Sequence, residues 1–387
     1  MMVKLGSYIE LIGGGTPSKA NEDYWNGNIP WASVKDFKSD VISKTQDFIT
    51  QEGIDNSVTR LIPKGTLLIA TRMAVGKVAF PAMDLAINQD LKAIKCKSQL
   101  DKKFLFYVLK SKSDYFNNIS TGATVKGIKI AHITDLKIPL PPLEQQKKIV
   151  SILDAADELR QKDKALIAKY DELTQSLFLD MFGDPVKNEK AWEIKKLGNV
   201  CLVGSSKRVF VEELVEEGIP FYRGTEVGKL GEGKAIRPTL FITKEHYEKL
   251  KDHRGVPKKG DLLMPSICPD GRIWVVDNDT PFYFKDGRVL WVEVDSKNIN
   301  SIYLRYHLKG SFFANYSNIA SGTTFAELKI VALKKMDIFY PELKLQNQFA
   351  ERVKAIETQK VQAQESLKKS EELFNSLLQR AFKAEVV

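Results

Sequence analysis

The spacing of apolar positions divides this chain of 387 residues into two kinds of segment. In residues 143–182 and 342–383, apolar side chains recur in alternating steps of four and three, a period that predicts long amphipathic helices. Residues 1–142 and 184–341 instead hold short runs of β-branched and aromatic residues separated by Gly, Pro, Asn and Asp. That pattern predicts strands joined by loops.

The two helical segments are expected to pack on each other. About 40 residues of helix extend about 60 Å, which is too long for one small domain to cover the apolar stripe. One stripe begins at Ile149 and the other at Phe349, so their length and register agree. If a pseudo-two-fold axis relates the two halves, the helices are antiparallel and form a coiled coil. The alternative is that each helix packs only on its own domain.

The two mixed segments contain similar candidate elements. Strand-like runs lie at 65–72, 76–80, 271–276 and 287–294. One helical candidate follows in each segment, with the sequences KKFLFYVLKSKSDYF and SIYLRYHLKGSFF. We therefore expect an α+β fold with many loops in both segments.

A repeated stretch shows how the two halves are related. Residues 119–130 read ISTGATVKGIKI and residues 319–330 read IASGTTFAELKI, an offset of 200 positions that persists through the helical segments. Upstream the offset shrinks to between 190 and 195, as for KGTLLI against KGDLLM. So long a period indicates a duplicated domain, not a solenoid. Gly122 and Gly322, which both repeats share, are expected to serve a tight loop because glycine permits positive φ.

The predicted architecture combines these observations. It consists of two similar β-rich domains with short helices, separated by a pair of long antiparallel helices in a pseudo-two-fold internal repeat. The expected boundaries are 1–142 for the first domain, 143–183 for the central helix, 184–341 for the second domain and 342–387 for the C-terminal helix.

Charge suggests what the domains bind. The formal net charge is +9, and the two helical segments together carry about −1, so the excess of basic residues lies in the two mixed segments. A polyanion is the usual partner of such a surface. Two similar but diverged basic domains on a rigid spacer could read two different short sequences on one DNA duplex, with the spacer setting their separation.

Residues in both halves resemble a known family. The run IPLPPLEQQKKIVSILDAADELRQKDKALIAKYDELTQSLFLDMFGDP is similar to the central region of the specificity (S) subunits of type I restriction-modification systems. GGGTPSKANEDYWNGNIPWASVKDF, GKVAF and AINQD resemble the first part of their target recognition domains. In the second copy YPELKLQNQF replaces PPLEQQKKI, so the start of that helix is less typical.

The resemblance implies a DNA-binding subunit without catalytic activity of its own. It also implies a bipartite, asymmetric target, two methyltransferase subunits docked on the helices, and restriction subunits that join through the assembly. Those partners would supply S-adenosylmethionine-dependent adenine methylation and ATP-dependent cleavage. A helical scaffold or adaptor that binds protein or RNA is the alternative.

The sequence lacks the motifs of an adenine methyltransferase, of a phosphate-binding loop and of a metal site. No NPPF-like or DPPY-like motif follows a Gly-rich cofactor loop, and GGGTPSK lacks the spacing of a phosphate-binding loop. The four histidines and three cysteines show no metal-ligand spacing. We expect no cofactor and no metal. Because neither a long apolar run nor a signal-peptide pattern is present, we expect a cytoplasmic protein.

Candidate DNA contacts are polar side chains in loops, because direct readout needs hydrogen-bonding groups that reach base edges. In the first segment they are Thr16, Ser18, Lys19, Arg72, Lys77, Asn88, Gln89, Thr121, Thr124 and Lys126. In the second they are Lys207, Arg208, Arg223, Arg272, Arg288, Ser321, Thr323 and Thr324. Trp31, Phe80, Trp274 and Trp291 lie in apolar runs and are expected to pack in the cores.

Overall fold

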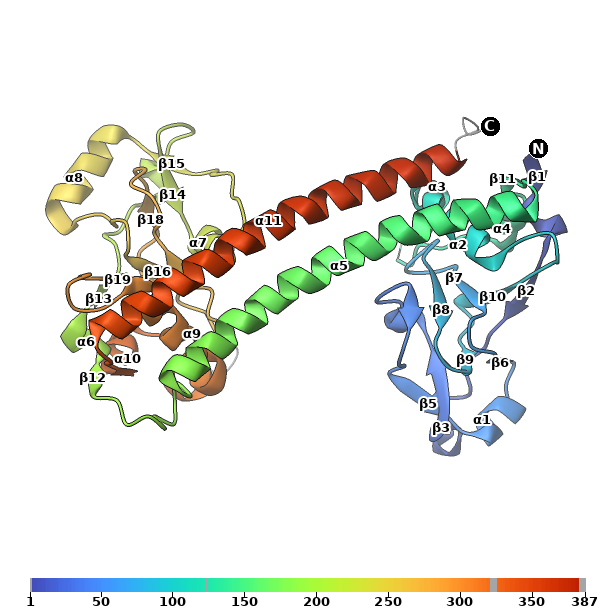
Figure 1. The fold of residues 1–387 in the computed structure, drawn as a ribbon, viewed down its shortest axis with the longest axis horizontal. Coiled ribbons are helices and arrows are strands. Elements are labelled where there is room, and N and C mark those ends of the chain that lie inside the picture. The colour runs from blue at the N-terminus through green and yellow to red at the C-terminus, as the bar shows by residue number, and fades with distance from the viewer. Residues whose placement is uncertain (1, 123, 321–325, 383–387) are drawn as a thin grey trace. The chain divides into compact units, whose positions relative to one another are not determined.

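The chain forms two compact units in a computed structural model that describes residues 2–122, 124–320 and 326–382. The first unit comprises Met1–Ala165 and Gln364–Val387, and the second comprises Leu166–Ala363. Two long helices, α5 (Leu143–Phe182) and α11 (Leu343–Phe382), contribute to both units. Each unit therefore holds one mixed α/β domain and part of each long helix (Figure 1).

Short strands arranged in small sheets form the domain of the first unit. One sheet has the order β2-β10-β7-β8-β4, a second has the order β5-β3-β9-β6, and β1 pairs with β11. The strands are β1 (Met2–Lys4), β2 (Ile9–Gly13), β3 (Trp25–Ala32), β4 (Val41–Ile42), β5 (Asp47–Ile49), β6 (Leu61–Ile62), β7 (Leu67–Ala70), β8 (Val78–Pro81), β9 (Leu85–Ile87), β10 (Leu91–Cys96) and β11 (Lys137–Pro139). All four residues of β7 are buried, as its central place between β10 and β8 requires.

The domain of the second unit repeats this arrangement. Its sheets have the orders β13-β19-β16-β17 and β15-β14-β18, and β12 pairs with β20. The strands are β12 (Ile194–Lys196), β13 (Leu202–Gly204), β14 (Ile219–Tyr222), β15 (Phe241–Ile242), β16 (Leu262–Pro265), β17 (Trp274–Val275), β18 (Tyr283–Phe284), β19 (Val289–Glu293) and β20 (Asp337–Phe339). The order β13-β19-β16-β17 matches β2-β10-β7-β8, which confirms the predicted internal repeat.

Short helices complete both domains. In the first unit they are α1 (Gln51–Asp55), α2 (Lys102–Ser111), α3 (Ser113–Ile119), α4 (Ile130–Thr134) and the 3₁₀ turns η1 (Leu5–Ser7), η2 (Glu22–Tyr24) and η3 (Val34–Asp36). In the second they are α6 (Leu197–Val200), α7 (Gly224–Gly231), α8 (Lys244–Arg254), α9 (Ser301–Ile319), α10 (Ile330–Lys335) and η4 (Val211–Glu213). The helical candidate KKFLFYVLKSKSDYF forms two helices, α2 and α3, where one was expected. The helix is interrupted at Lys112, whose N–H bonds to the Leu109 carbonyl at 3.0 Å.

A side-chain cap fixes the start of α2 and of α9. The Asp101 carboxylate accepts from the N–H groups of Lys103 and Phe104, and the Asn300 amide oxygen accepts from those of Ile302 and Tyr303. Such caps satisfy backbone donors that a helix leaves unpaired at its first turn.

Each capped helix is also joined to a long helix by a buried glutamine. The Gln146 side-chain oxygen accepts from the Asp101 N–H at 2.8 Å, and the Gln346 oxygen accepts from the Asn300 N–H at 2.9 Å. The less typical start of the second long helix therefore preserves the same contact.

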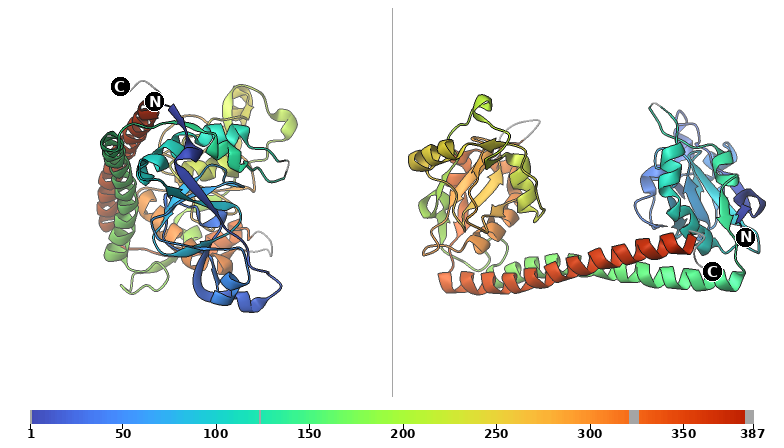
Figure 2. Two further views of the ribbon diagram at one scale, coloured as in Figure 1. Left: turned by 90° about the vertical axis from the view of Figure 1, so that its right-hand side faces the viewer. Right: turned by 90° about the horizontal axis from the view of Figure 1, so that it is seen from above.

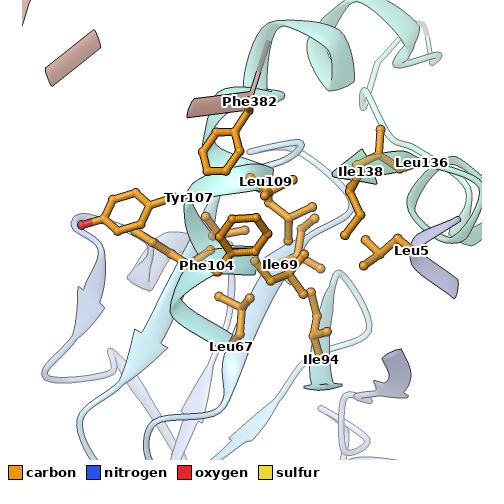
Figure 3. Close-up of a cluster of buried hydrophobic side chains, with 14 of the residues drawn as sticks. Leu5, Leu67, Ile69, Ile94, Phe104, Tyr107, Leu109, Leu136, Ile138 and Phe382 are labelled. Atoms are coloured by element: carbon orange, nitrogen blue, oxygen red, sulfur yellow. The ribbon is translucent and has the colours of Figure 1, made fainter. Parts of the chain in front are cut away.

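Both cores join the domain to the long helices. In the first unit, Phe104 of α2 packs edge-on against Phe382 of α11, with 5.4 Å between ring centroids (Figure 3). Figure 3 also shows Leu5, Leu67, Ile69 and other apolar side chains of the domain gathered beside this pair.

In the second unit, Phe182 of α5 lies 4.6 Å from Tyr303 and 5.4 Å from Phe349 between ring centroids. Burial on this scale supplies the main favourable free energy of folding.

The portions of α5 and α11 that belong to one unit pack on each other, as predicted (Figure 2). Every predicted stripe position from Ile149 to Met181 and from Phe349 to Ala381 is buried or half-buried. In the first unit Asp163 contacts Ser370 while Arg160 lies over the ring of Phe374, so the two helix portions are antiparallel. The alternative that each helix packs only on its own domain is therefore wrong.

Two further expectations concern the buried aromatic residues and the absence of a long apolar segment. Trp31, Trp274 and Trp291 are buried, and the half-buried Phe80 packs on the core of the first unit, as predicted. No described helix combines the length and the apolar composition that a membrane span requires.

Candidate nucleic-acid interface

Loops from distant parts of the sequence meet at one edge of the first domain, and we call them the first loop cluster. It consists of residues 14–16, 71–77, 88–90, 121–122 and 124–128. The first of these loops follows β2 and packs directly on the backbone that ends β9. The Gly15 N–H donates to the Ile87 carbonyl at 2.9 Å, and a Cβ added to Gly14 would lie 2.1 Å from the same oxygen. The glycine run is therefore required for close backbone approach, and it places the Thr16 hydroxyl against the side-chain oxygen of Gln89.

The repeated stretch supplies the second side of the first loop cluster. Its residue Ile128 donates its N–H to the Thr71 carbonyl at 2.9 Å, and Lys126 accepts from the Met73 N–H at 3.0 Å. Arg72 also forms an isolated β-bridge with Gly127. The stretch thus holds the turn after β7 in a fixed position.

Two cations lie around Asp90 in the first loop cluster. Arg72 has a nitrogen 3.9 Å from an Asp90 oxygen, with 63% of the Arg72 side chain exposed. Lys92 donates its ammonium to the Gln89 carbonyl at 2.7 Å. Burial, with a smaller contribution from Arg72, lowers the pKa of Lys92 against the opposing effect of Asp90. The exposed edge therefore presents a guanidinium, an ammonium and an amide side by side.

The second unit builds an equivalent second loop cluster from residues 205–208, 266–272, 285–288 and 326–328. Leu328 donates its N–H to the Ser266 carbonyl at 2.7 Å, as Ile128 does to Thr71. Ser266 in turn donates to the Arg288 carbonyl at 2.9 Å, as Thr71 does to Asp90 at 2.7 Å. The repeated stretch occurs twice because in each domain it holds the same turn.

A hollow of about 570 Å³ opens in the second loop cluster. Its apolar lining includes Phe221, Leu240 and Ile267. The cationic side chains that line it are Arg223, Arg272, Lys285 and Arg288.

Every one of these four cations has a carboxylate neighbour. Arg223 donates two hydrogen bonds to Glu226, at 2.7 and 3.2 Å, which raises the pKa of its guanidinium. The remaining pairs are Arg272 with Asp270, Lys285 with Asp286, and Arg288 with Glu327. Arg208, outside the hollow, also pairs with Asp286 at 3.2 Å.

The ion pairs orient the guanidinium groups and lower the local positive potential. A fixed guanidinium fork suits a planar acceptor edge such as that of guanine. Phosphate binding alone is favoured by a high positive potential, whereas base-edge readout depends on oriented hydrogen-bonding groups. The lowered potential therefore suits a surface that reads base edges.

The structure brings many of the sequence-predicted residues together. Thr16, Arg72, Lys77, Gln89, Thr121, Thr124 and Lys126 belong to the first loop cluster, and Lys207, Arg208, Arg272 and Arg288 belong to the second, with Arg223 on the lining of its hollow. Asn88 is buried, and its side-chain oxygen accepts from the Asp90 N–H at 3.1 Å, so it supports the turn from inside.

The other predicted residues fall into two groups. Ser18 and Lys19 are exposed beyond the first loop cluster, where the Ser18 carbonyl accepts from the Trp25 indole. Ser321, Thr323 and Thr324 lie outside the described residues, as does Gly322, whereas Gly122 has the positive φ that was predicted, +128°.

Lys92 and Lys285 are site cations that the sequence did not single out. Lys285 follows the aromatic pair of β18 and lies three residues before Arg288. Its place in a strand-ending turn is the signal that could have identified it. Among the described residues, no group of three or more His, Cys, Asp and Glu side chains could hold a metal ion.

Comparison with known proteins identifies the repeated domain. The family model described as "Type I restriction modification DNA specificity domain" matches residues 1–169 and again 189–373. The chain is 31% identical over 366 residues to the MjaIX specificity subunit of a type I restriction enzyme from Methanocaldococcus jannaschii, covering 86% of this chain and 81% of that protein. It is 34% identical over 162 residues to the EcoR124I/EcoR124II specificity subunit of Escherichia coli, covering 40% of each.

Solved structures share the fold. The type I restriction-modification S subunit from M. genitalium superposes with a TM-score of 0.58 at 17% identity, over 100% of this chain and 96% of that one. A chain from a study of complex assembly and conformational transition in the type I system gives 0.61 at 18% identity, over 100% and 98%. Both matches extend over both repeats and both long helices.

Proposed function

Since the chain belongs to the family of type I restriction-modification DNA specificity domains, we propose that it is the specificity subunit of such a complex and reads a split DNA target. Each recognition domain reads one part of the target through its loop cluster. The observation that carries this proposal is the pair of equivalent loop clusters, each held by the same backbone contact from the repeated stretch. A scaffold or adaptor for protein or RNA is not favoured, because the family model and the relatives are all of the specificity type.

The two parts of the target are expected to differ in sequence. At equivalent places the first loop cluster has Arg72 and Asp90, whereas the second has Ile267 and Arg288. Arginine favours the acceptor edge of guanine, an apolar side chain favours the thymine methyl group, and a carboxylate favours the cytosine amino group. A perfectly palindromic target would contradict this part of the proposal.

The long helices are the proposed docking surfaces for two methyltransferase subunits, through which restriction subunits join. Each unit exposes apolar side chains on its helix portions. They include Ile152, Leu159 and Leu373 in the first unit and Leu166, Leu173 and Val361 in the second. Exposed apolar side chains at such spacing on a helix are suited to a partner helix. Adenine methylation and ATP-dependent cleavage would be activities of those partners, acting on DNA that this chain selects.

A pair of conservative substitutions tests the proposal. We expect Arg72→Lys to weaken methylation that depends on the first half-target, roughly 5- to 150-fold. Arg223→Lys should weaken methylation that depends on the second half-target by a similar factor. Lysine keeps the charge but loses the fork, so a loss that depends on the sequence of one half-target points to base readout and not to attraction by charge alone. The measurement is adenine methylation, by the complex with its methyltransferase subunits, of duplexes altered in one half-target at a time.

Lys249→Ala is the matched control, because Lys249 is exposed on α8, pairs with Glu245 and does not line the hollow of the second loop cluster. It should leave methylation unchanged. Full activity and unchanged discrimination in both arginine variants would refute the assignment of the loop clusters as the reading surface.

A further inference from the structure

Met73 is an apolar side chain held in solvent at the centre of the first loop cluster. It is 66% exposed, and its φ of +61° lies in the left-handed region that bulky residues rarely adopt. A residue in this conformation persists only where its surroundings fix it, and such residues gather at ligand-contacting positions.

Backbone hydrogen bonds fix the turn that carries Met73. The Met73 N–H donates to the Lys126 carbonyl at 3.0 Å, and the Ala74 N–H donates to the Arg72 carbonyl at 2.7 Å. Gly76, itself at φ +77°, donates to the Ala70 carbonyl at 2.9 Å. The turn is therefore rigid, and the Met73 side chain is presented in one direction with little conformational freedom left in the backbone.

The residues around Met73 indicate what it meets. Arg72 precedes it, and the Lys126 backbone bonds to it. The second loop cluster also has an apolar side chain in the equivalent turn, where Ile267 lines the cationic hollow. An exposed apolar group between cations fits a surface that carries both negative charge and methyl groups. In the DNA major groove the apolar feature of a base edge is the C5-methyl group of thymine.

We propose that Met73 is a specificity-determining residue that packs against the C5-methyl group of a thymine in the first half-target. The inference rests on the proposed DNA-reading function and assigns one contact within it. Arg72 and Gln89 supply hydrogen bonds to neighbouring bases. Met73 supplies an apolar contact to the thymine methyl group, which cytosine lacks. Its fixed backbone means that little ordering is needed when the contact forms.

The test replaces single thymines by deoxyuridine, which removes only the methyl group. The duplex carries the methylation target of the complex, and each thymine of both half-targets is replaced in turn. For the complex of the unaltered chain with its methyltransferase subunits, one replacement in the first half-target should raise Kd about fourfold, the effect of one methyl group removed from water. With Met73→Gly, the thymine duplex should already bind about fourfold more weakly, and the same replacement should have no further effect.

Two features keep the result interpretable. Glycine accepts positive φ, so Met73→Gly should fold at least as well as the parent, which its Tm reports. Met73→Asn is the second variant, because asparagine tolerates the left-handed region but is polar, and it should also lose the methyl effect. Thymines of the second half-target are internal controls whose replacement should act equally in all three proteins.

The outcomes separate the inference from the proposed function. Two results would overturn the role of Met73 while leaving specific binding intact. The first is a change in Kd on deoxyuridine replacement that is the same in both variants as in the parent. The second is a first half-target in which no such replacement changes Kd. A complex that binds no sequence in preference to another would overturn the proposed function itself.

Discussion

His307 is a buried neutral side chain that makes the second unit sensitive to acid. Its Nε2 accepts the Phe339 N–H at 3.0 Å, and no part of the residue is exposed. Burial lowers the pKa of His307 to about 4, whereas an unfolded histidine titrates near about 6.5. Between these values the unfolded chain binds more protons than the folded chain, so stability falls as the pH falls through that window.

Substitution of His307 should remove this part of the pH dependence. Between pH 7.5 and 5.0 the parent should lose about 2 kcal/mol of unfolding free energy through this residue, and His307→Gln should not lose it. Glutamine retains an acceptor for the Phe339 N–H, although its shape differs. Urea unfolding at both pH values measures the difference, with the exposed His253 changed to Gln as the control. Parallel pH dependence in parent and His307→Gln would mean that this residue is not the cause.

The sequence indicates which types of residue line the loop clusters more reliably than it indicates which individual side chains are exposed there. Arg223, Arg272 and Arg288 were identified because guanidinium groups suit base edges, and they line one hollow. Asn88 was selected on the same reasoning but turns inward, because its amide closes the turn with Asp90. Met73 was not among the candidates because only polar side chains were chosen for base readout, and its positive φ is a property of the fold that the sequence does not show.

The seam between α5 and α11 buries a carboxylate in the first unit where the second unit buries an alanine. In the first unit the buried Asp163 carboxylate accepts from the hydroxyl groups of Ser366 at 3.1 Å and Ser370 at 2.8 Å. The position 200 residues after Asp163 is Ala363, which is buried in the second unit. A single polar position in an apolar seam fixes register at a cost in stability.

Removal of one hydroxyl group should therefore cost more than removal of the whole contact. Ser370→Ala leaves a buried carboxylate short of a donor, and we expect a loss of about 1.5–3 kcal/mol in unfolding free energy. Asp163→Ala combined with Ser370→Ala reproduces the apolar character of the Ala363 position and should recover much of that loss. Ser176→Ala, at an exposed site on α5, is the control.

Hydrogen exchange of residues 364–382, alongside urea unfolding, locates the effect in the first unit. A double variant no more stable than Ser370→Ala would show that Asp163 does not act through its serine contacts.

Elements with a strict period were predictable, and those that depend on distant contacts were not. The apolar stripe from Phe349 to Ala381 could be predicted because the helical repeat alone decides which side chains of α11 face α5. The loop clusters depend on contacts between residues about 20 to 80 positions apart, such as Thr71 with Asp90 or Arg208 with Asp286. Sequence periodicity carries no record of those contacts.

The continuity of the two long helices bears on how the halves of a target are spaced. Each of α5 and α11 extends through 40 residues, and the boundary between the two units crosses them after Ala165 and after Ala363. The seam contacts on either side of that boundary are separate sets, with Asp163 bonded to Ser370 in the first unit and Asp171 to Lys360 at 2.5 Å in the second. Insertions at the boundary can therefore leave both sets intact.

Matched insertions of four residues, after Ala165 and after Ala363, test whether the helices set the spacing of the target. Four residues add about 6 Å to a helix and turn it by about 40° beyond one full turn, so the buried faces nearly keep their direction. That length corresponds to roughly two base pairs at about 3.4 Å each. We expect both half-targets to be unchanged and the spacer between them to grow by one or two base pairs, as mapped from methylated adenines.

A two-residue insertion at the same places separates length from helical phase. It rotates the helix portions of one unit by about 200° relative to those of the other, so the seams of both units cannot form along continuous helices and assembly with the methyltransferase subunits should fail. The four-residue variant should assemble normally and differ only in its target. Methylation of the original spacing by a folded four-residue variant would show that the helices do not act as the ruler, because a rigid spacer lengthened by one turn cannot present both loop clusters to the same two sites.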